Sequence, residues 1–135
     1  MANTFYPKGA EKMLTAAINY SSDTIKVGIV SDAYTYSTAH EFLSDAGTLV
    51  GTAQTLGSKA ITGGVFDAAD PAFGAIAPGS TAKALIMWKD TGNPATSPLL
   101  AYLDQLTGFP FATNGGAVTV PWSNGAGKIF SLMPA

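Results

Sequence analysis

The triplet Asp90-Thr91-Gly92 is the most specific chemical feature of the sequence, because it follows the apolar run of residues 84–88. An aspartate at the end of a buried strand is suited to acid–base chemistry when a second carboxylate faces it, since two close carboxylates share one proton. A chain of 135 residues would have to dimerise to bring two such carboxylates together.

The order Asp-Thr-Gly after a strand resembles the active-site triplet of aspartic proteases. Three features depart from that family: Lys89 precedes the aspartate, Asn93-Pro94 interrupts the loop, and no later apolar-Gly element follows. We therefore favour a strand that ends in a polar turn. A dimeric aspartic protease using Asp90 is kept as the alternative of another class.

His40 is the one histidine of the chain, so a metal site built on two histidines is excluded. The His40 imidazole, with the Glu41 carboxylate next to it in sequence, is a candidate general base. The favoured interpretation is a histidine hydrogen-bonded in a loop before Phe42, because no nucleophile motif of the type G-x-S-x-G accompanies it.

Two further sets of residues have a chemical and a structural interpretation. Asp67 and Asp70 have cation-binding oxygens, but they lack the alternating ligands of a calcium loop, so we expect turn and capping roles. Residues 51–59 and 125–128 lack the phosphate-loop spacing, so both are expected to be turns. With no cysteine in the chain, the sequence assigns no catalytic, cofactor-binding or metal-binding residue, and we predict that the protein is not an enzyme.

The charge of the chain limits its partners. Charged residues make up 12% of the sequence, and the seven basic residues are all lysines that stand singly in a chain of net charge −2. Phosphate recognition favours arginine forks and basic stripes, so we predict no nucleic-acid partner. Low charge leaves two interpretations open: the surface packs against other subunits, or small residues such as Ala, Gly, Ser and Thr cover it.

Hydropathy gives a similar limit. Hydrophobic residues make up 47% of the chain and the mean hydropathy is +0.22. No uninterrupted apolar run approaches about 18 residues, the length of a membrane span. We expect a chain that does not enter a membrane, and no export signal, since residues 1–7 lack a basic flank followed by an apolar segment.

One amphipathic helix is expected near the start, at residues 10–18. Ala10, Met13, Leu14, Ala17 and Ile18 recur with helical spacing and would form one apolar stripe. A helix this short is stabilised mainly by docking that stripe. We therefore expect the stripe to pack against the sheet or a neighbouring subunit, with Leu14 buried.

The remaining chain has the pattern of short strands separated by turn signals. Residues 25–29 alternate, residues 84–88 are apolar on both faces and predict a central strand, and residues 99–103 predict another strand. Residues 118–122 predict an edge strand, because Pro121 cannot donate to a ladder. We expect residues 128–133 to return beside it as a hairpin. The predicted fold is a single all-β domain over residues 1–135, an antiparallel β-sandwich or barrel-like domain with one short N-terminal helix.

Taken in order, these segments are similar to small structural proteins encoded by tailed bacteriophages. The resemblance covers nearly the whole chain and depends on the order of its segments rather than on one motif. It is carried by residues 23–30, 34–45, 59–70, 84–92, 99–108 and 114–130.

Some members of that family resemble capsid decoration or cement proteins, and the resemblance implies no catalytic residues. It implies a virion protein that is synthesised in the bacterial host cytoplasm and binds the major capsid protein or another virion protein. A tail- or fibre-associated role is the alternative. From the few charges and free edge strands we expect a homo-oligomer, a dimer or trimer.

A third hypothesis is a glycan-binding module. Exposed aromatic rings stack on sugars, and the candidates are Tyr34, Tyr36, Trp88 and Trp122. Aromatic residues at strand spacing are more often part of the core.

Overall fold

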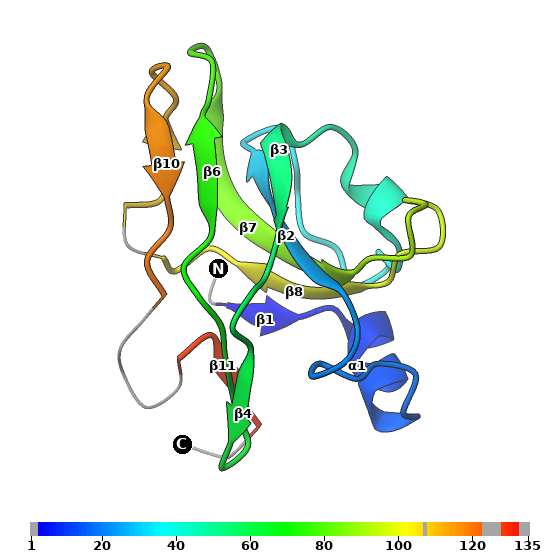
Figure 1. Cartoon of the computed structure of the whole chain (residues 1–135). Helices are drawn as coiled ribbons and strands as arrows, with labels where there is room; N and C mark the ends of the chain where they lie inside the picture. The colour runs from blue at the N-terminus through cyan, green and yellow to red at the C-terminus, as the bar shows by residue number, and fades with distance from the viewer. Residues whose placement is uncertain (1–2, 107, 123–127, 133–135) are drawn as a thin grey trace.

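The computed structural model describes residues 3–106, 108–122 and 128–132. Its strands are antiparallel and one short α-helix lies near the N-terminus, which confirms the predicted all-β class (Figure 1). The helices are α1 (Pro7–Leu14) and a 3₁₀ helix, η1 (Leu43–Ala46). The strands are β1 (Thr4–Phe5), β2 (Ile25–Ser31), β3 (Val50–Thr55), β4 (Ala60–Thr62), β5 (Val65–Asp67), β6 (Ala72–Ala75), β7 (Thr81–Lys89), β8 (Leu99–Leu103), β9 (Phe111–Ala112), β10 (Ala117–Thr119) and β11 (Phe130–Ser131).

The largest sheet has the strand order β1-β8-β7-β2-β3, and β9 pairs with the start of β7. Its middle strand, β7, places Met87 opposite Val27 of β2 and Ala101 of β8. Residues 84–88 are buried on both faces of this sheet. The prediction of a central strand at residues 84–88 is therefore confirmed.

One face of the large sheet is covered by two smaller sheets, β10-β6 and β11-β5-β4 (Figure 1). Phe66 of β5 and Phe73 of β6 belong to the same buried cluster as Leu85 and Met87 of β7. The opposite face carries Ala84, Ile86 and Trp88. Strand alternation thus divides β7 between two cores.

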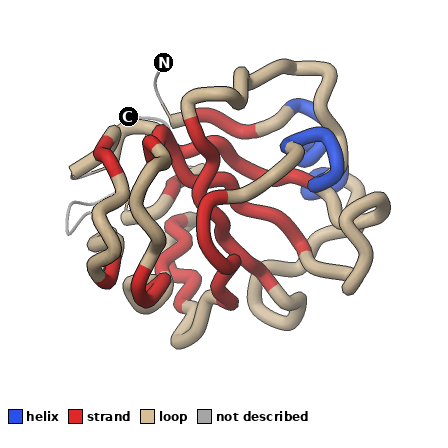
Figure 2. The backbone as a smooth tube through the Cα atoms, turned by 90° about the horizontal axis from the view of Figure 1, so that it is seen from above, coloured by secondary structure: helices blue, strands red, loops and turns tan. Residues whose placement is uncertain are grey.

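Loops rather than strands cover that second face. Residues 32–49 and 90–98 are joined there by backbone hydrogen bonds, Leu43 N–H to the Ser97 carbonyl at 2.8 Å and Ser44 N–H to the Pro94 carbonyl at 3.0 Å. Both helical segments lie on this side of the molecule, away from the two small sheets (Figures 1 and 2).

The helix differs from its predicted range of residues 10–18 at both ends. It begins at Pro7, whose fixed φ suits the first helical position. It ends after Leu14, because Ala16 adopts a left-handed φ of 65°. The amides of Ala16 and Ala17 then donate to the carbonyls of Met13 (3.3 Å) and Lys12 (2.9 Å), which closes the helix as a Schellman motif.

The prediction that Leu14 is buried is wrong within the chain, because Leu14 is 88% exposed and the buried residue of the helix is Gly9. The predicted packing of the stripe against the sheet is confirmed in part, since Met13 packs against the first core. A Cβ at Gly9 would lie 2.1 Å from the Leu99 carbonyl oxygen. The helix therefore packs against β8 through its backbone at Gly9. Because the Gly9 side of the helix faces β8, Leu14 faces outward. Ile18, beyond the helix end, is buried as expected.

The predicted hairpin of residues 118–122 with 128–133 is not formed by the described residues. β10 pairs with β6, as an edge strand should, whereas β11 pairs with β5 and places Phe130 opposite Phe66. Phe130 also contacts the rings of Phe5 and Tyr20, at centroid distances of 4.9 and 5.2 Å. Aromatic packing thus explains why β11 pairs with β5. The predicted turn at 123–127 and Met133 lie outside the described residues.

Gly9→Ala tests the backbone contact between α1 and β8. Helix propensity alone would make this change stabilising by about 1 kcal/mol, whereas the clash with the Leu99 carbonyl should destabilise the fold by about 1–3 kcal/mol. Leu14→Ala is the control and should change stability by less than about 0.5 kcal/mol. Chemical denaturation measures both, and a more stable Gly9→Ala variant would contradict the described packing.

Candidate functional site

Asp90 begins a polar turn directly after β7. Its amide donates to the Thr24 carbonyl at 2.8 Å, and its carboxylate lies 3.7 Å from the Lys26 ammonium. The Thr91 hydroxyl is 2.6 Å from the Thr96 hydroxyl and 3.1 Å from that of Ser97. These bonds hold the turn closed, and the polar-turn interpretation of the triplet is confirmed.

His40 lies in the loop that covers the second face of the large sheet. Its Nδ1 is 2.8 Å from the hydroxyl of Tyr34, which confirms the expected hydrogen-bonded loop histidine. Glu41 turns away to the ammonium of Lys12, at 2.7 Å. The structure therefore separates the two residues considered for general-base chemistry.

The Tyr34 hydroxyl continues inward to the hydroxyl of Tyr6, at 2.7 Å. Tyr6 is fully buried and the ring of Tyr36 packs 5.0 Å from its own, so burial raises the pKa of Tyr6 well above its ordinary value. Burial also raises the pKa of Tyr34. The chain Tyr6–Tyr34–His40 is thus a hydrogen-bond chain from the core to the surface. Sequence reasoning missed it because Tyr6 is remote in sequence from the other two residues.

Asp67 and Asp70, the two aspartates considered for cation binding, have structural roles. Asp70 accepts the Trp122 amide at 2.9 Å, as expected for a turn residue, and Asp67 ends β5. In the same way Asp45 accepts the amides of Glu41 (2.8 Å) and Phe42 (3.1 Å). Those two amides hold the pKa of the Asp45 carboxyl below its ordinary value.

Three of the four aromatic residues considered for sugar stacking are buried. Tyr34, Trp88 and Trp122 are at most 7% exposed. The indole N–H of Trp122 donates to the Ala69 carbonyl at 3.1 Å. These side chains belong to the cores, so the glycan-binding hypothesis loses the rings on which it depended.

Most of the lysines tie distant segments of the chain together. Lys83 donates to the Tyr34 carbonyl at 2.8 Å, and Lys89 to the Ala17 carbonyl at 3.1 Å. Lys59 donates to the Asp23 carbonyl. With the pairs Lys12–Glu41 and Lys26–Asp90, five of the seven lysines contact groups remote in sequence. The side chains of Lys12, Lys26 and Lys89 stay 25–32% exposed in their ion pairs.

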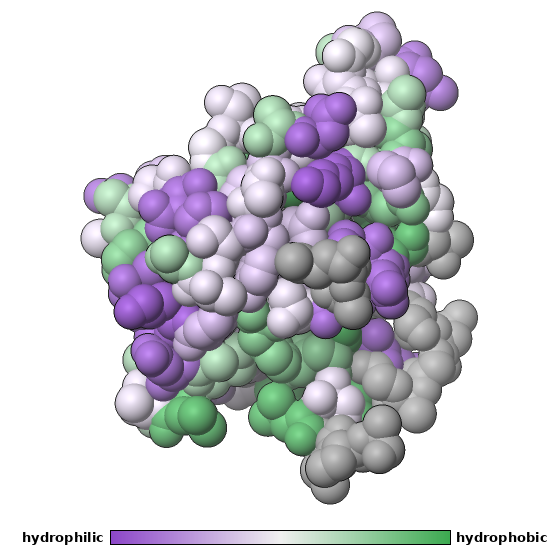
Figure 3. All heavy atoms as spheres, turned by 180° about the vertical axis from the view of Figure 1, so that it is seen from behind, coloured by the Kyte–Doolittle hydropathy of each residue, from purple (hydrophilic) through white to green (hydrophobic). Residues whose placement is uncertain are grey.

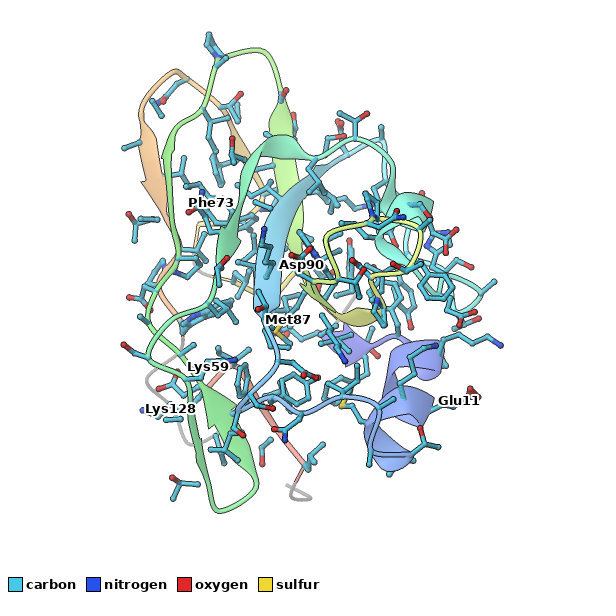
Figure 4. All side chains as sticks on the ribbon, turned by 45° about the vertical axis from the view of Figure 1, so that its right-hand side comes forward. Glu11, Lys59, Phe73, Met87, Asp90 and Lys128 are labelled. Atoms are coloured by element: carbon cyan, nitrogen blue, oxygen red, sulfur yellow. The ribbon has the colours of Figure 1, made fainter. Side chains whose placement is uncertain are left out.

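The two segments considered as phosphate loops are not equivalent in the structure. Residues 51–55 belong to strand β3, which corrects the expected turn at 51–59. Residues 125–127 lie outside the described part of the chain. Lys59 donates to the Asp23 carbonyl, and Lys128 is exposed at the surface (Figure 4).

An apolar groove lies between β1 and β11. It has a volume of about 420 Å³ and is lined by Asn3, Thr4, Phe5, Ala101, Leu103, Lys128, Ile129, Phe130 and Ser131. Lys128 is the one charged residue of this lining. Each of the two flanking strands is the last of its sheet, so the groove is open between two sheet edges.

Two leucine side chains are highly exposed, and one of them, Leu132, directly follows the groove residue Ser131. Leu14 at the end of α1 is 88% exposed and Leu132 after β11 is 67% exposed. Hydrophobic side chains gather at the lower end of the molecule, where α1, β1 and β11 lie (Figure 3). Exposed apolar side chains beside a groove are typical of a protein-binding site. We therefore take the groove, with the adjoining Leu132, as the candidate functional site.

Within the described ranges, no group of three or more His, Asp or Glu side chains is placed to hold a metal ion. The described helices include none with the length and hydropathy of a membrane span. Comparison with protein families, with curated proteins and with solved structures finds no match to this chain.

The hydroxyl chain under the second face makes a prediction about stability. Tyr34→Phe removes the middle hydroxyl and takes away the partner of the buried Tyr6 hydroxyl, so it should cost about 1–3 kcal/mol. Tyr6→Phe leaves the Tyr34–His40 bond in place and should cost about 0.5–1.5 kcal/mol. Equal costs in denaturant titrations, or a larger cost for Tyr6→Phe, would contradict this hydrogen-bond chain.

Proposed function

We propose that this chain is a structural protein of a tailed-bacteriophage particle that decorates or cements the capsid, without catalysis. The similarity of its ordered segments to small virion structural proteins supports this role. The single structural observation in its favour is the groove between β1 and β11, which adjoins the exposed Leu132. Such a surface offers shape and apolar area to a protein partner.

The distribution of charge favours the same conclusion. Lysines that bind carbonyls and carboxylates of their own chain do not form a field that steers polyanions. Burying a surface with few free charges requires little desolvation. A protein that must stay attached to a particle through many small contacts gains from such a surface, because multiple sites raise the effective concentration.

A tail- or fibre-associated position is the runner-up, since the same apolar groove would fit either partner. Labelling intact particles with a gold-conjugated antibody against this chain separates the two roles. Label distributed over the head supports capsid decoration, and label confined to the tail supports the runner-up. Unlabelled particles would contradict both.

Release from particles tests the nature of the contact. We expect the protein to stay on virions in about 1 M salt, where exposed charges are screened beyond roughly 3 Å. Mild denaturant should release it, because denaturant solvates apolar and peptide groups. Sedimentation of the particles followed by gel analysis measures the bound fraction. Release by salt alone would show that ion pairs hold the protein, against this proposal.

Asp90→Asn separates the structural role from the protease alternative. Asp90 contacts Lys26 in a partly exposed pair, so its loss should cost at most about 1 kcal/mol. We expect the variant to assemble on particles like the wild type, and neither protein to cleave peptides at acidic pH. Acid-pH cleavage by the wild type that disappears in Asp90→Asn would support the protease and contradict the proposed function.

A further inference from the structure

The hairpin of β4 and β5 forms the lower tip of the molecule (Figure 1). In the sheet β11-β5-β4, β5 is the middle strand and β4 is an edge strand, with Ile61 opposite Phe66. The Phe66 carbonyl accepts the Ile129 amide at 3.2 Å, so the backbone groups of Phe66 point toward β11. Opposite residues of an antiparallel pair point their backbone groups either toward each other or both away. The amide and carbonyl of Ile61 therefore point off the open edge of the sheet.

The side chain of Ile61 lies on the same face of the hairpin as Phe66, because residues directly opposite share a face. Phe66 is 2% exposed, whereas Ile61 is 51% exposed. Ala60 and Thr62 point to the other face, where both line a pocket. Ile61 thus extends the apolar face of Phe66 to the edge, where a further strand would cover it.

Strand β4 lacks the features that usually keep an edge strand from pairing, which are bulges, prolines and charges. It pairs with β5 without a register shift, whereas the pairings of the edge strands β3 and β10 each contain one. Its three residues are Ala60, Ile61 and Thr62. The charged residue next to them, Lys59, donates to the Asp23 carbonyl. The edge of β4 is therefore open to a further strand.

A second copy of β4 fits this edge when it runs antiparallel. A two-fold axis beside Ile61 places this residue opposite itself, and each Ile61 amide then donates to the Ile61 carbonyl of the other copy. The two isoleucine side chains lie side by side on one face of the joined sheet. The same register puts Lys59 opposite Gly63 of the other copy, whereas a parallel register would put two lysines side by side.

We propose that a second copy of this chain pairs with β4 at Ile61, so that the two three-stranded sheets join across a two-fold axis. This inference rests on the proposed structural function and deepens it by naming the self-contact. The contact has far fewer residues on each side than a standard interface, so it is weak in solution. Copies held on one particle are at a high effective concentration, and there a weak contact is occupied.

Sedimentation velocity of the full-length protein, over a concentration series up to about 1 mM, tests the contact. We expect a reversible dimer with a Kd of about 0.1 mM. Ile61→Lys should weaken it about tenfold or more, because like charges then face each other across the axis. Leu14→Lys is the matched control, since Leu14 is exposed, at 88%, and lies outside the contact. It should leave the Kd unchanged.

Ile61→Pro tests the backbone bonds. Proline has no amide to donate, and an edge strand tolerates it where the amide points away from the sheet. The variant should therefore keep the wild-type denaturation midpoint and lose the dimer. Ile61→Val keeps the amide and should dimerise within about threefold of the wild type.

Four results would overturn the contact. They are a wild type that stays monomeric at about 1 mM, an Ile61→Pro variant that dimerises normally, and a Leu14→Lys variant as weak as Ile61→Lys. The fourth is a strongly destabilised Ile61→Pro variant, which would show that the Ile61 amide points into the sheet.

Cross-linking tests the position of the axis. The chain has no cysteine, so Ile61→Cys introduces a single thiol beside the axis. A short bismaleimide should link two copies of this variant in high yield. Leu14→Cys carries its thiol at an exposed position outside the contact and should give little product. Equal yields from the two variants would contradict the proposed axis.

The particle experiments distinguish failure of this contact from failure of the proposed function. A chain that labels the head of virions but stays monomeric at about 1 mM would overturn the self-contact alone. A chain that dimerises through Ile61 but is missing from virions would support the self-contact and overturn the structural role in the particle.

Discussion

Burial of β7 on both faces is the constraint on which the rest of the structure depends. A strand with Leu85 and Met87 on one side and Ile86 and Trp88 on the other must be covered twice. Two small sheets cover the first side, and the loops of residues 32–49 and 90–98 cover the second. Those loops carry backbone groups that strands would have paired, and polar side chains satisfy them instead. Asp45 accepts the Glu41 amide, and Lys83 donates to the Tyr34 carbonyl.

The same constraint explains where the charges go. Loops packed on a sheet need fixed positions, and lysines supply them by reaching carbonyls of remote segments, as Lys83 does at Tyr34 and Lys89 at Ala17. The outer surface is left poor in charge, and its apolar groove lies between the sheet edges that the two small strands β1 and β11 leave open. The two-sided core and the proposed protein-binding surface thus have one feature in common, which is the small number of charged residues in the chain.

Much of the fold could be predicted from the sequence, because strand patterns are local. The apolar run at 84–88 was sufficient to predict the central strand. The helix end was missed, since an alanine rather than a glycine takes the left-handed position at Ala16. The partner of β11 depends on rings of Phe5, Tyr20 and Phe66 from three other segments, and periodicity along one strand contains no such information. The groove could not be predicted either, because its lining comes from segments that are far apart in the sequence.

A reconstruction of the particle that is proposed to carry this chain tests the central claim most directly. The account predicts density for this fold on the outer surface of the head. Particles complete in every other component but without density for this chain would contradict it.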